Sequence, residues 1–221
     1  MRYHIDTIPV WDAYRRDTEC PLCDLRAATE QGYLEDFLGA SVMEPSVRIE
    51  VNAKGFCAGH FARMLGMKNR LGLALMTHTH LKQTLQSIDK APASPKRRAA
   101  PEPERETCIL CERLNFTMER YLYTVCHLWK TDAEFQKTFV ASKGLCLPHY
   151  RQLLAMAARE MDARAAAAFT DALARVQREN MARIEKELEW FTLKFDYRNA
   201  DKPWGTSKDA PERAIEKLRG K

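Results

Sequence analysis

Apolar residues recur at intervals of three and four positions along almost the whole chain, the spacing that places them on one side of an α-helix. Prolines divide this pattern into segments, and Pro9, Pro21 and Pro45 stand where the first turn of a helix tolerates a residue without an N–H group. Gly55 and Gly144 can supply the left-handed backbone that ends one segment and turns the chain into the next. The sequence therefore predicts an all-α protein.

Two long helices are predicted to carry most of the apolar surface, one from Cys57 to about Ser87 and one from Cys146 to Phe195. The stripe of the first runs through Leu71, Leu75, Leu81, Leu85 and Ile88, with His78 as a core histidine. The stripe of the second includes Tyr150, Leu153, Phe169, Leu173, Val176, Asn180, Ile184, Leu188 and Phe191. Shorter helices are expected over 9–16, 20–38, 45–51 and 108–129, after a cap at Thr131 or Asp132, and after a cap at Ser207 or Asp209.

One pattern of cysteine and histidine occurs twice. Cys20-x-x-Cys23 is followed by Cys57-x-x-His60, and Cys108-x-x-Cys111 is followed by Cys146-x-x-His149. The offset between the copies is 88 residues at the CxxC motif and 89 at the CxxH motif, and Lys54-Gly55-Phe56-Cys57 recurs as Lys143-Gly144-Leu145-Cys146. These matches indicate that an ancestral unit was duplicated and fused.

The repeat predicts the organisation of the chain. Residues 1–88 form a first metal-binding helical unit, and 107–200 form a second. Between them, 89–106 contains four prolines and no aromatic or large aliphatic residue, which is typical of a linker, and 201–221 is a tail with a short helix. The expected fold is a pseudo-twofold helical bundle with a long C-terminal helix.

Composition narrows the class of protein. The 221 residues are 45% hydrophobic and 29% charged, as in an ordinary globular chain, but each half is small and benefits from a metal that cross-links it. The N-terminus lacks the apolar run of a secretory signal and no segment suits a membrane span, so we expect a cytoplasmic protein with no membrane partner. In a reducing cytosol, CxxC motifs favour metal or redox chemistry over structural disulfides.

Charge argues against a nucleic-acid partner. The net charge is +5 and the isoelectric point about 8.8, with basic residues spread along helices among nearly as many acidic ones. The one tight cluster, Lys96-Arg97-Arg98, falls in the predicted linker. A nucleic-acid-binding domain would concentrate its positive charge on one face.

The spacing of the repeated motifs predicts two zinc ions per chain. Residues three apart in the first turn of a helix face the same side, so a CxxC helix and a CxxH helix can together present four donor atoms. We expect one site from Cys20, Cys23, Cys57 and His60, and a second from Cys108, Cys111, Cys146 and His149. Three thiolates and an imidazole fill the tetrahedral coordination of Zn²⁺, leaving no position for water or substrate, so both sites are expected to be structural. The intervals of 34 and 35 residues between inner ligands are too long for a DNA-reading zinc finger.

Other chemistries compete for the same residues. An iron–sulfur cluster ordinarily uses four cysteines and is disfavoured, and covalent haem requires CxxCH, whereas Asp24 and Glu112 follow the second cysteines. A thiol redox switch, or a metal-dependent enzyme, is the alternative to a structural role. No motif of a known enzyme class is present, so we favour an interaction or regulatory module with protein partners, its long C-terminal helix providing the contact surface. Cys126 is expected in the core, and Asn180 is expected to fix helix register.

The motifs also resemble a known family. Cys20-Pro21-Leu22-Cys23, Lys54-Gly55-Phe56-Cys57 with His60, their second copies, and the ending Trp204-Gly205 with 210–220 are similar to a bacterial family defined as a domain of unknown function. The resemblance covers nearly the whole chain and implies a helical protein with duplicated metal-type motifs. Some members carry a transporter solute-binding label, but a periplasmic binding protein would have an export signal and α/β lobes, which this sequence does not predict.

Overall fold

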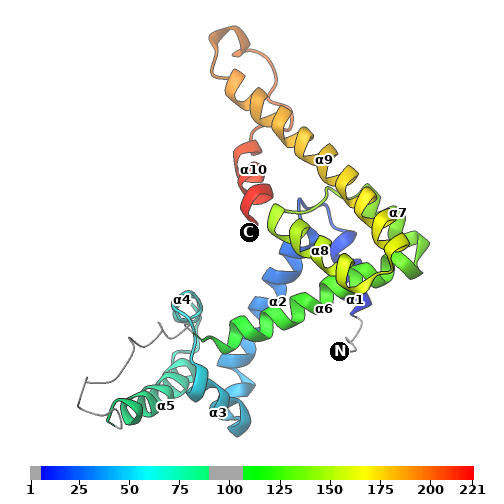
Figure 1. Ribbon diagram of the computed structural model, residues 1–221. Helices are drawn as coiled ribbons and strands as arrows, with labels where there is room; N and C mark the ends of the chain where they lie inside the picture. Colours follow the sequence, from blue (N-terminus) through cyan, green and yellow to red (C-terminus); the bar gives the residue numbers. More distant parts are fainter. Residues whose placement is uncertain (1–5, 90–106) are drawn as a thin grey trace, which may run out of the picture. The chain divides into compact units, whose positions relative to one another are not determined.

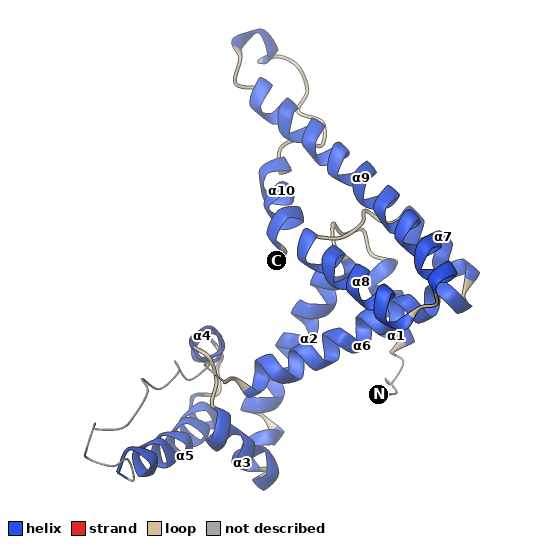
Figure 2. Cartoon of the chain, viewed as in Figure 1, coloured by secondary structure: helices blue, strands red, loops and turns tan. Residues whose placement is uncertain are grey.

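A computed structural model describes residues 6–89 and 107–221 (Figures 1 and 2). The described residues form helices and no strand, so the all-α prediction is confirmed. The predicted linker lies almost wholly outside them. No described helix combines the length and apolar character needed to cross a membrane. The helices are α1 (Thr7–Tyr14), α2 (Pro21–Leu38), η1 (Ala40–Met43), α3 (Pro45–Lys54), α4 (Ala58–Gly66), α5 (Arg70–Asp89), α6 (Ile109–Thr131), α7 (Ala133–Ala141), α8 (Leu147–Glu160), α9 (Ala163–Leu193), η2 (Tyr197–Asn199) and α10 (Ala210–Arg219).

The helix boundaries follow the proline and glycine signals. Pro21 and Pro45 open α2 and α3, where the missing N–H would have had no intrahelical partner. Gly55 and Gly144 adopt φ values of 65° and 76°, in the left-handed region that a residue with a Cβ rarely occupies. Asp132 caps α7 by accepting hydrogen bonds from the N–H groups of the second and third helical residues.

Both long helices predicted from the apolar stripes are interrupted. The first divides into α4 and α5, and the second into α8 and α9. At each break a polar side chain caps the new helix: Asn69 Oδ1 accepts from Gly72 N–H at 2.8 Å, and Asp162 Oδ1 accepts from Ala165 N–H at 2.9 Å. An amphipathic period persists across a cap, which explains why periodicity alone missed both breaks.

The apolar stripe predicted for α5 is exposed. Gly72, Leu73 and Met76 are its buried residues, and the predicted core histidine His78 is also exposed. A Cβ on Gly72 would lie 2.9 Å from the Leu38 carbonyl oxygen, so the glycine permits this close contact and determines which face turns inward. The exposed residues are Leu71, Leu75, Leu81, Leu85 and Ile88.

The helices form two compact units, each with its own core. Unit 1 comprises residues 1–27 and 117–221, and unit 2 comprises 28–116. Unit 1 is built around edge-to-face and tilted contacts among aromatic rings that α1, α6, α7 and α9 contribute; they include Tyr14, Trp129, Phe135, Phe139 and Phe169. Unit 2 has a smaller core that includes Leu34, Phe37, Val51, Phe56, Met64, Leu73 and Met76.

The units do not coincide with the two copies of the repeat. Their boundaries fall inside α2 and inside α6, rather than in the proline-rich segment. The first copy therefore gives its first 27 residues to unit 1, and the second copy gives 107–116 to unit 2. The exchanged segments are the ones that carry the two CxxC motifs.

Candidate metal centres

Each of the four cysteine motifs begins a helix. The first cysteine stands directly before the helix, and the second ligand is the third helical residue, in α2, α4, α6 and α8 alike. Cys57 and Cys146 have nearly identical backbone angles, φ −69° and ψ 162° against φ −70° and ψ 155°. The two donor atoms of a motif therefore face the same side of the first turn, where unpaired N–H groups and the positive end of the helix favour thiolate.

The first cluster lies in unit 1. Cys20 and Cys23, at the start of α2, meet Cys146 and His149, at the start of α8, and all four are buried. His149 Nδ1 lies 3.5 Å from Cys20 Sγ, 3.4 Å from Cys23 Sγ and 3.2 Å from Cys146 Sγ. The Cys23 and Cys146 sulfurs are 3.6 Å apart.

The second cluster lies in unit 2. Cys57 and His60, at the start of α4, meet Cys108 and Cys111, at the start of α6. His60 Nδ1 lies 3.2 Å from both Cys57 Sγ and Cys108 Sγ, and 3.5 Å from Cys111 Sγ. The Cys57 and Cys111 sulfurs are 3.9 Å apart, and these two residues are half-buried whereas the other two are buried.

The expected grouping of ligands was wrong. We expected each cluster to take its CxxC and CxxH motifs from the same copy of the repeat, but each takes one motif from either copy. Helix geometry determines the spacing inside a motif, whereas the pairing of motifs depends on which helix starts are brought together by packing. All eight predicted residues nevertheless lie in the two clusters, and Cys126 lies in neither.

Both clusters have the dimensions of a tetrahedral site. A zinc ion with bonds of about 2.3 Å to sulfur and about 2.0 Å to nitrogen spaces its ligands by about 3.8 Å between sulfurs and about 3.5 Å from sulfur to nitrogen. In the two clusters the separations are 3.6 and 3.9 Å between sulfurs and 3.2–3.5 Å from sulfur to nitrogen. The donor atoms in each cluster all lie within 4.8 Å of one another. The residues present therefore fit a metal ion.

Crowding of the sulfurs also favours a cation at each cluster. Burial, followed by hydrogen bonds with Cys146 and Cys23, raises the pKa of the Cys20 thiol far above its ordinary value. Hydrogen bonds from Cys146 and Cys20 lower the pKa of Cys23 instead. In the second cluster, burial and then contact with Cys108 raise the pKa of Cys111 to about 12. One thiol of each cluster, Cys20 or Cys111, thus resists ionisation beside the other sulfurs, and a bound cation would remove that resistance.

A carboxylate orients the histidine of the second cluster. Glu30, on α2, lies 3.1 Å from His60 Nε2, the ring nitrogen on the side away from the sulfurs. Burial alone would raise the pKa of Glu30, but an ion pair with Arg63 and then the contact with His60 hold it below its usual value. A carboxylate that accepts the Nε2 proton leaves Nδ1 unprotonated and directed at the metal position. No motif in the sequence pointed to Glu30.

The helix starts in the second cluster are joined by direct hydrogen bonds. Ile109 N–H donates to the Gly55 carbonyl oxygen at 3.2 Å, and Thr107 Oγ1 donates to the Lys54 carbonyl oxygen at 2.8 Å. The position in the first copy that corresponds to Ile109 is Pro21, which has no N–H to donate. The first cluster therefore needs a different connection.

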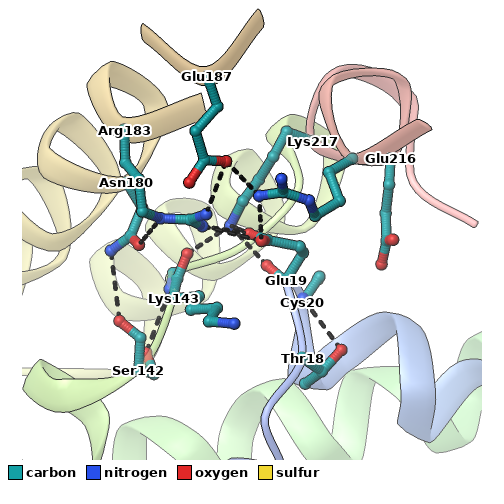
Figure 3. Close-up of polar contacts among 12 residues, drawn as sticks. Thr18, Glu19, Cys20, Ser142, Lys143, Asn180, Arg183, Glu187, Glu216 and Lys217 are labelled. Carbon is teal, nitrogen blue, oxygen red and sulfur yellow. Dashed lines mark hydrogen bonds and ion pairs between the residues drawn. The ribbon is translucent and has the colours of Figure 1, made fainter. Parts of the chain in front are cut away.

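Lys217 of α10 provides that connection (Figure 3). Its side chain is 1% exposed and donates to the carbonyl oxygens of Glu19, directly before Cys20, and of Lys143, in the turn before Cys146. The Glu19 carboxylate lies 3.3 Å from the Lys217 ammonium and is also paired with Arg183 at 2.6 Å. One buried ammonium thus ties together the two segments that lead into the ligand motifs.

Two further residues behave as the sequence predicted. Cys126 is buried, and burial followed by the charge of Glu160 raises its pKa to about 12, as expected for a core thiol. Asn180 Nδ2 donates to the Ser142 and Val176 carbonyl oxygens at 3.3 and 3.0 Å. Asn180 therefore links α9 to the turn before Cys146, in agreement with a role in register.

Comparisons with known proteins identify relatives but no activity. A family model described as "Family of unknown function (DUF6062)" matches residues 1–221. The "Uncharacterized 23.9 kDa protein in xynA 3'region" of Caldicellulosiruptor sp. (strain Rt8B.4) is 22% identical over 184 residues, which is 83% of this chain and 86% of that protein. No solved structure matches the chain.

Replacing Lys217 with methionine should destabilise unit 1. The change leaves the carbonyl groups of Glu19 and Lys143 without their donor, and we expect the free energy of unfolding to fall by about 2–3 kcal/mol. Chemical denaturation followed by circular dichroism measures this. Lys208→Met is the matched control, because Lys208 is exposed; equal losses for both variants would contradict the connecting role of Lys217.

Proposed function

Because the chain belongs to the DUF6062 family of unknown function, we propose its function from the geometry of its ligand clusters: it is a zinc-binding helical protein in which two closed Cys₃His sites stabilise the fold. One observation supports this above all. Two sets of three sulfurs and one imidazole nitrogen, each gathered from two helix starts, have the spacing of a tetrahedral zinc site.

The ligand set favours zinc and a structural role. Thiolate and imidazole together suit Zn²⁺, whereas iron–sulfur clusters ordinarily use four cysteines. Four protein ligands complete a tetrahedron, so neither site offers a position at which a substrate could be activated. Each ion would instead hold two helices together, α2 with α8 in unit 1 and α4 with α6 in unit 2. A cytoplasmic location, where thiols stay reduced, agrees with seven cysteines that form no disulfide.

We propose that the protein acts as an interaction module, and that its partner surface is on α5. The sequence suggested the long C-terminal helix, but Phe169, Leu173, Val176 and Ile184 of α9 are buried. In α5, by contrast, Leu81, Leu85 and Ile88 are exposed at spacings of four and three, and Leu71 is exposed nearer the start of the helix. A face of this kind suits an amphipathic helix of another protein.

Metal analysis and one substitution test the zinc sites. The purified chain should contain about two zinc ions, and Cys57→Ser should contain about one, because only the second cluster loses a ligand. In this variant we expect Cys108 and Cys111 to become open to alkylation, as mapped by mass spectrometry, while Cys20, Cys23 and Cys146 stay protected. Exposure of Cys20 and Cys23 instead would show that each site takes its ligands from one copy of the repeat. Iron and sulfide in the purified protein would show instead that the sites hold an iron–sulfur cluster.

Replacing Glu30 with glutamine should weaken zinc binding at the second site only. The amide keeps the size of the side chain but no longer accepts the Nε2 proton with a full negative charge, and we expect roughly a tenfold loss of zinc affinity. Competition with a chromogenic chelator measures this loss. Glu35→Gln is the matched control on the same helix, because Glu35 contacts Gln31 and is exposed. Unchanged affinity in Glu30→Gln would remove Glu30 from the site.

Photo-crosslinking tests the partner surface. A photoreactive phenylalanine analogue at position 85, on the apolar face of α5, should give a discrete crosslinked protein in host cells, since Leu85 is 53% exposed. The same analogue at position 86, which is also exposed but points away from this face, is the control. Equal crosslinking from both positions would contradict the proposed surface, and a product of two copies of this chain would identify self-association in place of a separate partner.

A further inference from the structure

The two clusters differ in how far solvent reaches their sulfurs. In the first, all four ligands are buried, and the backbone of Gly220 packs on the site: a Cβ built on that residue would lie 3.6 Å from both Cys23 Sγ and Cys146 Sγ. The end of α10 therefore covers this cluster. In the second, Cys57 and Cys111 are half-buried.

A surface pocket of about 420 Å³ adjoins the second cluster, and Cys57 forms part of its wall. The other walls come from α3, α5 and the segment before α6, and are mostly polar; they include Asn52, His80, Gln83, Ser87 and Thr107. Amide, hydroxyl and imidazole groups admit water and small polar molecules. Cys57 is therefore the ligand that a small polar reagent can approach.

We propose that Cys57 and Cys111 are an oxidation site: a hydroperoxide converts this pair to a disulfide and releases the metal of the second centre, while the first centre does not react. This inference rests on the proposed function, in which both centres hold zinc. Two observations support it together: both residues are half-buried, with Cys57 lining the polar pocket, and their sulfurs are 3.9 Å apart.

The reaction balances with the hydroperoxide as the only oxidant. The Cys57 thiolate attacks a peroxide oxygen, an S–O bond forms as the O–O bond breaks, and the leaving oxyanion takes a proton from water. The Cys111 thiolate then attacks the sulfenic sulfur, an S–S bond forms, and the departing hydroxide is protonated to water. The two sulfurs lose two electrons, which reduce one peroxide. Only His60 and Cys108 remain as ligands, too few to retain zinc.

The disulfide would join the same two helices as the metal. Cys57 stands at the start of α4 and Cys111 in the first turn of α6, so the bond would hold these helix starts together after the ion leaves. The disulfide would therefore replace the metal as the link between α4 and α6. A thiol reductant together with zinc would reverse the reaction.

Oxidation of the intact, zinc-loaded chain by hydrogen peroxide tests this site. With a chromogenic chelator present, we expect one of two zinc ions to leave at least about tenfold faster than the other, since accessible thiolates react before buried ones. Mass spectrometry should find a Cys57–Cys111 disulfide at that stage. Buried Cys126, outside both clusters, is the internal control and should stay reduced.

Different results would contradict the zinc-binding function and the oxidation site. A purified chain without zinc would overturn the proposed function. Two bound zinc ions that leave together, or earlier oxidation of Cys20, Cys23 or Cys146, or no release at all, would overturn only the oxidation site. Ser87→Trp narrows the pocket and should slow release about tenfold at unchanged zinc content, whereas Gln86→Trp, outside the pocket, should not. Equal rates in the two variants would show that the pocket is not the route.

Discussion

The architecture depends on the meeting of helix N-termini from different copies of a sequence repeat. The start of α2 meets that of α8, and the start of α4 meets that of α6. Helix starts carry unpaired N–H groups and a partial positive charge, so bringing two of them together is unfavourable unless negative charge lies between them. Thiolates can supply that charge, and a cation bound between them would in turn compensate the thiolates. Removing either would leave like charges facing each other at two places in the chain.

Because each CxxC segment packs with the CxxH segment of the other copy, the two clusters link parts of the chain that are far apart in sequence. Each unit is discontinuous in sequence, because 1–27 belongs with 117–221, and 107–116 belongs with 28–106. A metal inside one copy of the repeat would close a local loop, whereas the observed pairings link positions 123 and 51 residues apart, as in Cys23 with Cys146 and His60 with Cys111. Linking distant positions restricts the unfolded chain more strongly, which suits small cores that bury limited apolar surface.

The two clusters differ in their surroundings. In the second cluster, Ile109 and Thr107 donate hydrogen bonds directly from one helix start to the other. In the first, Pro21 has no N–H to donate, and the buried ammonium of Lys217 connects the two segments instead. The same helix brings Gly220 over the sulfurs of the first centre. The second has Glu30 behind its histidine and an open pocket beside Cys57 instead. The two clusters thus contain the same residue types but differ in how easily solvent reaches their cysteines, and this access determines which thiolates can react.

Patterns in the amino-acid sequence were enough to predict the helical class, most helix starts, the eight cysteine and histidine residues of the two clusters and the local geometry of each motif. These depend on short-range chemistry: the period of a helix, the fixed φ of proline, the freedom of glycine at Gly55 and Gly144, and the three-residue spacing inside a turn. The pairing of the motifs, the inward orientation of Gly72 and Met76 in α5, and the contacts of Glu30 and Lys217 with the clusters became visible only in the folded chain. Those features join residues that are far apart in the chain. Because both copies have the same local pattern, a CxxC motif could pair with either CxxH motif, and the packing of the helices selects one of the two pairings.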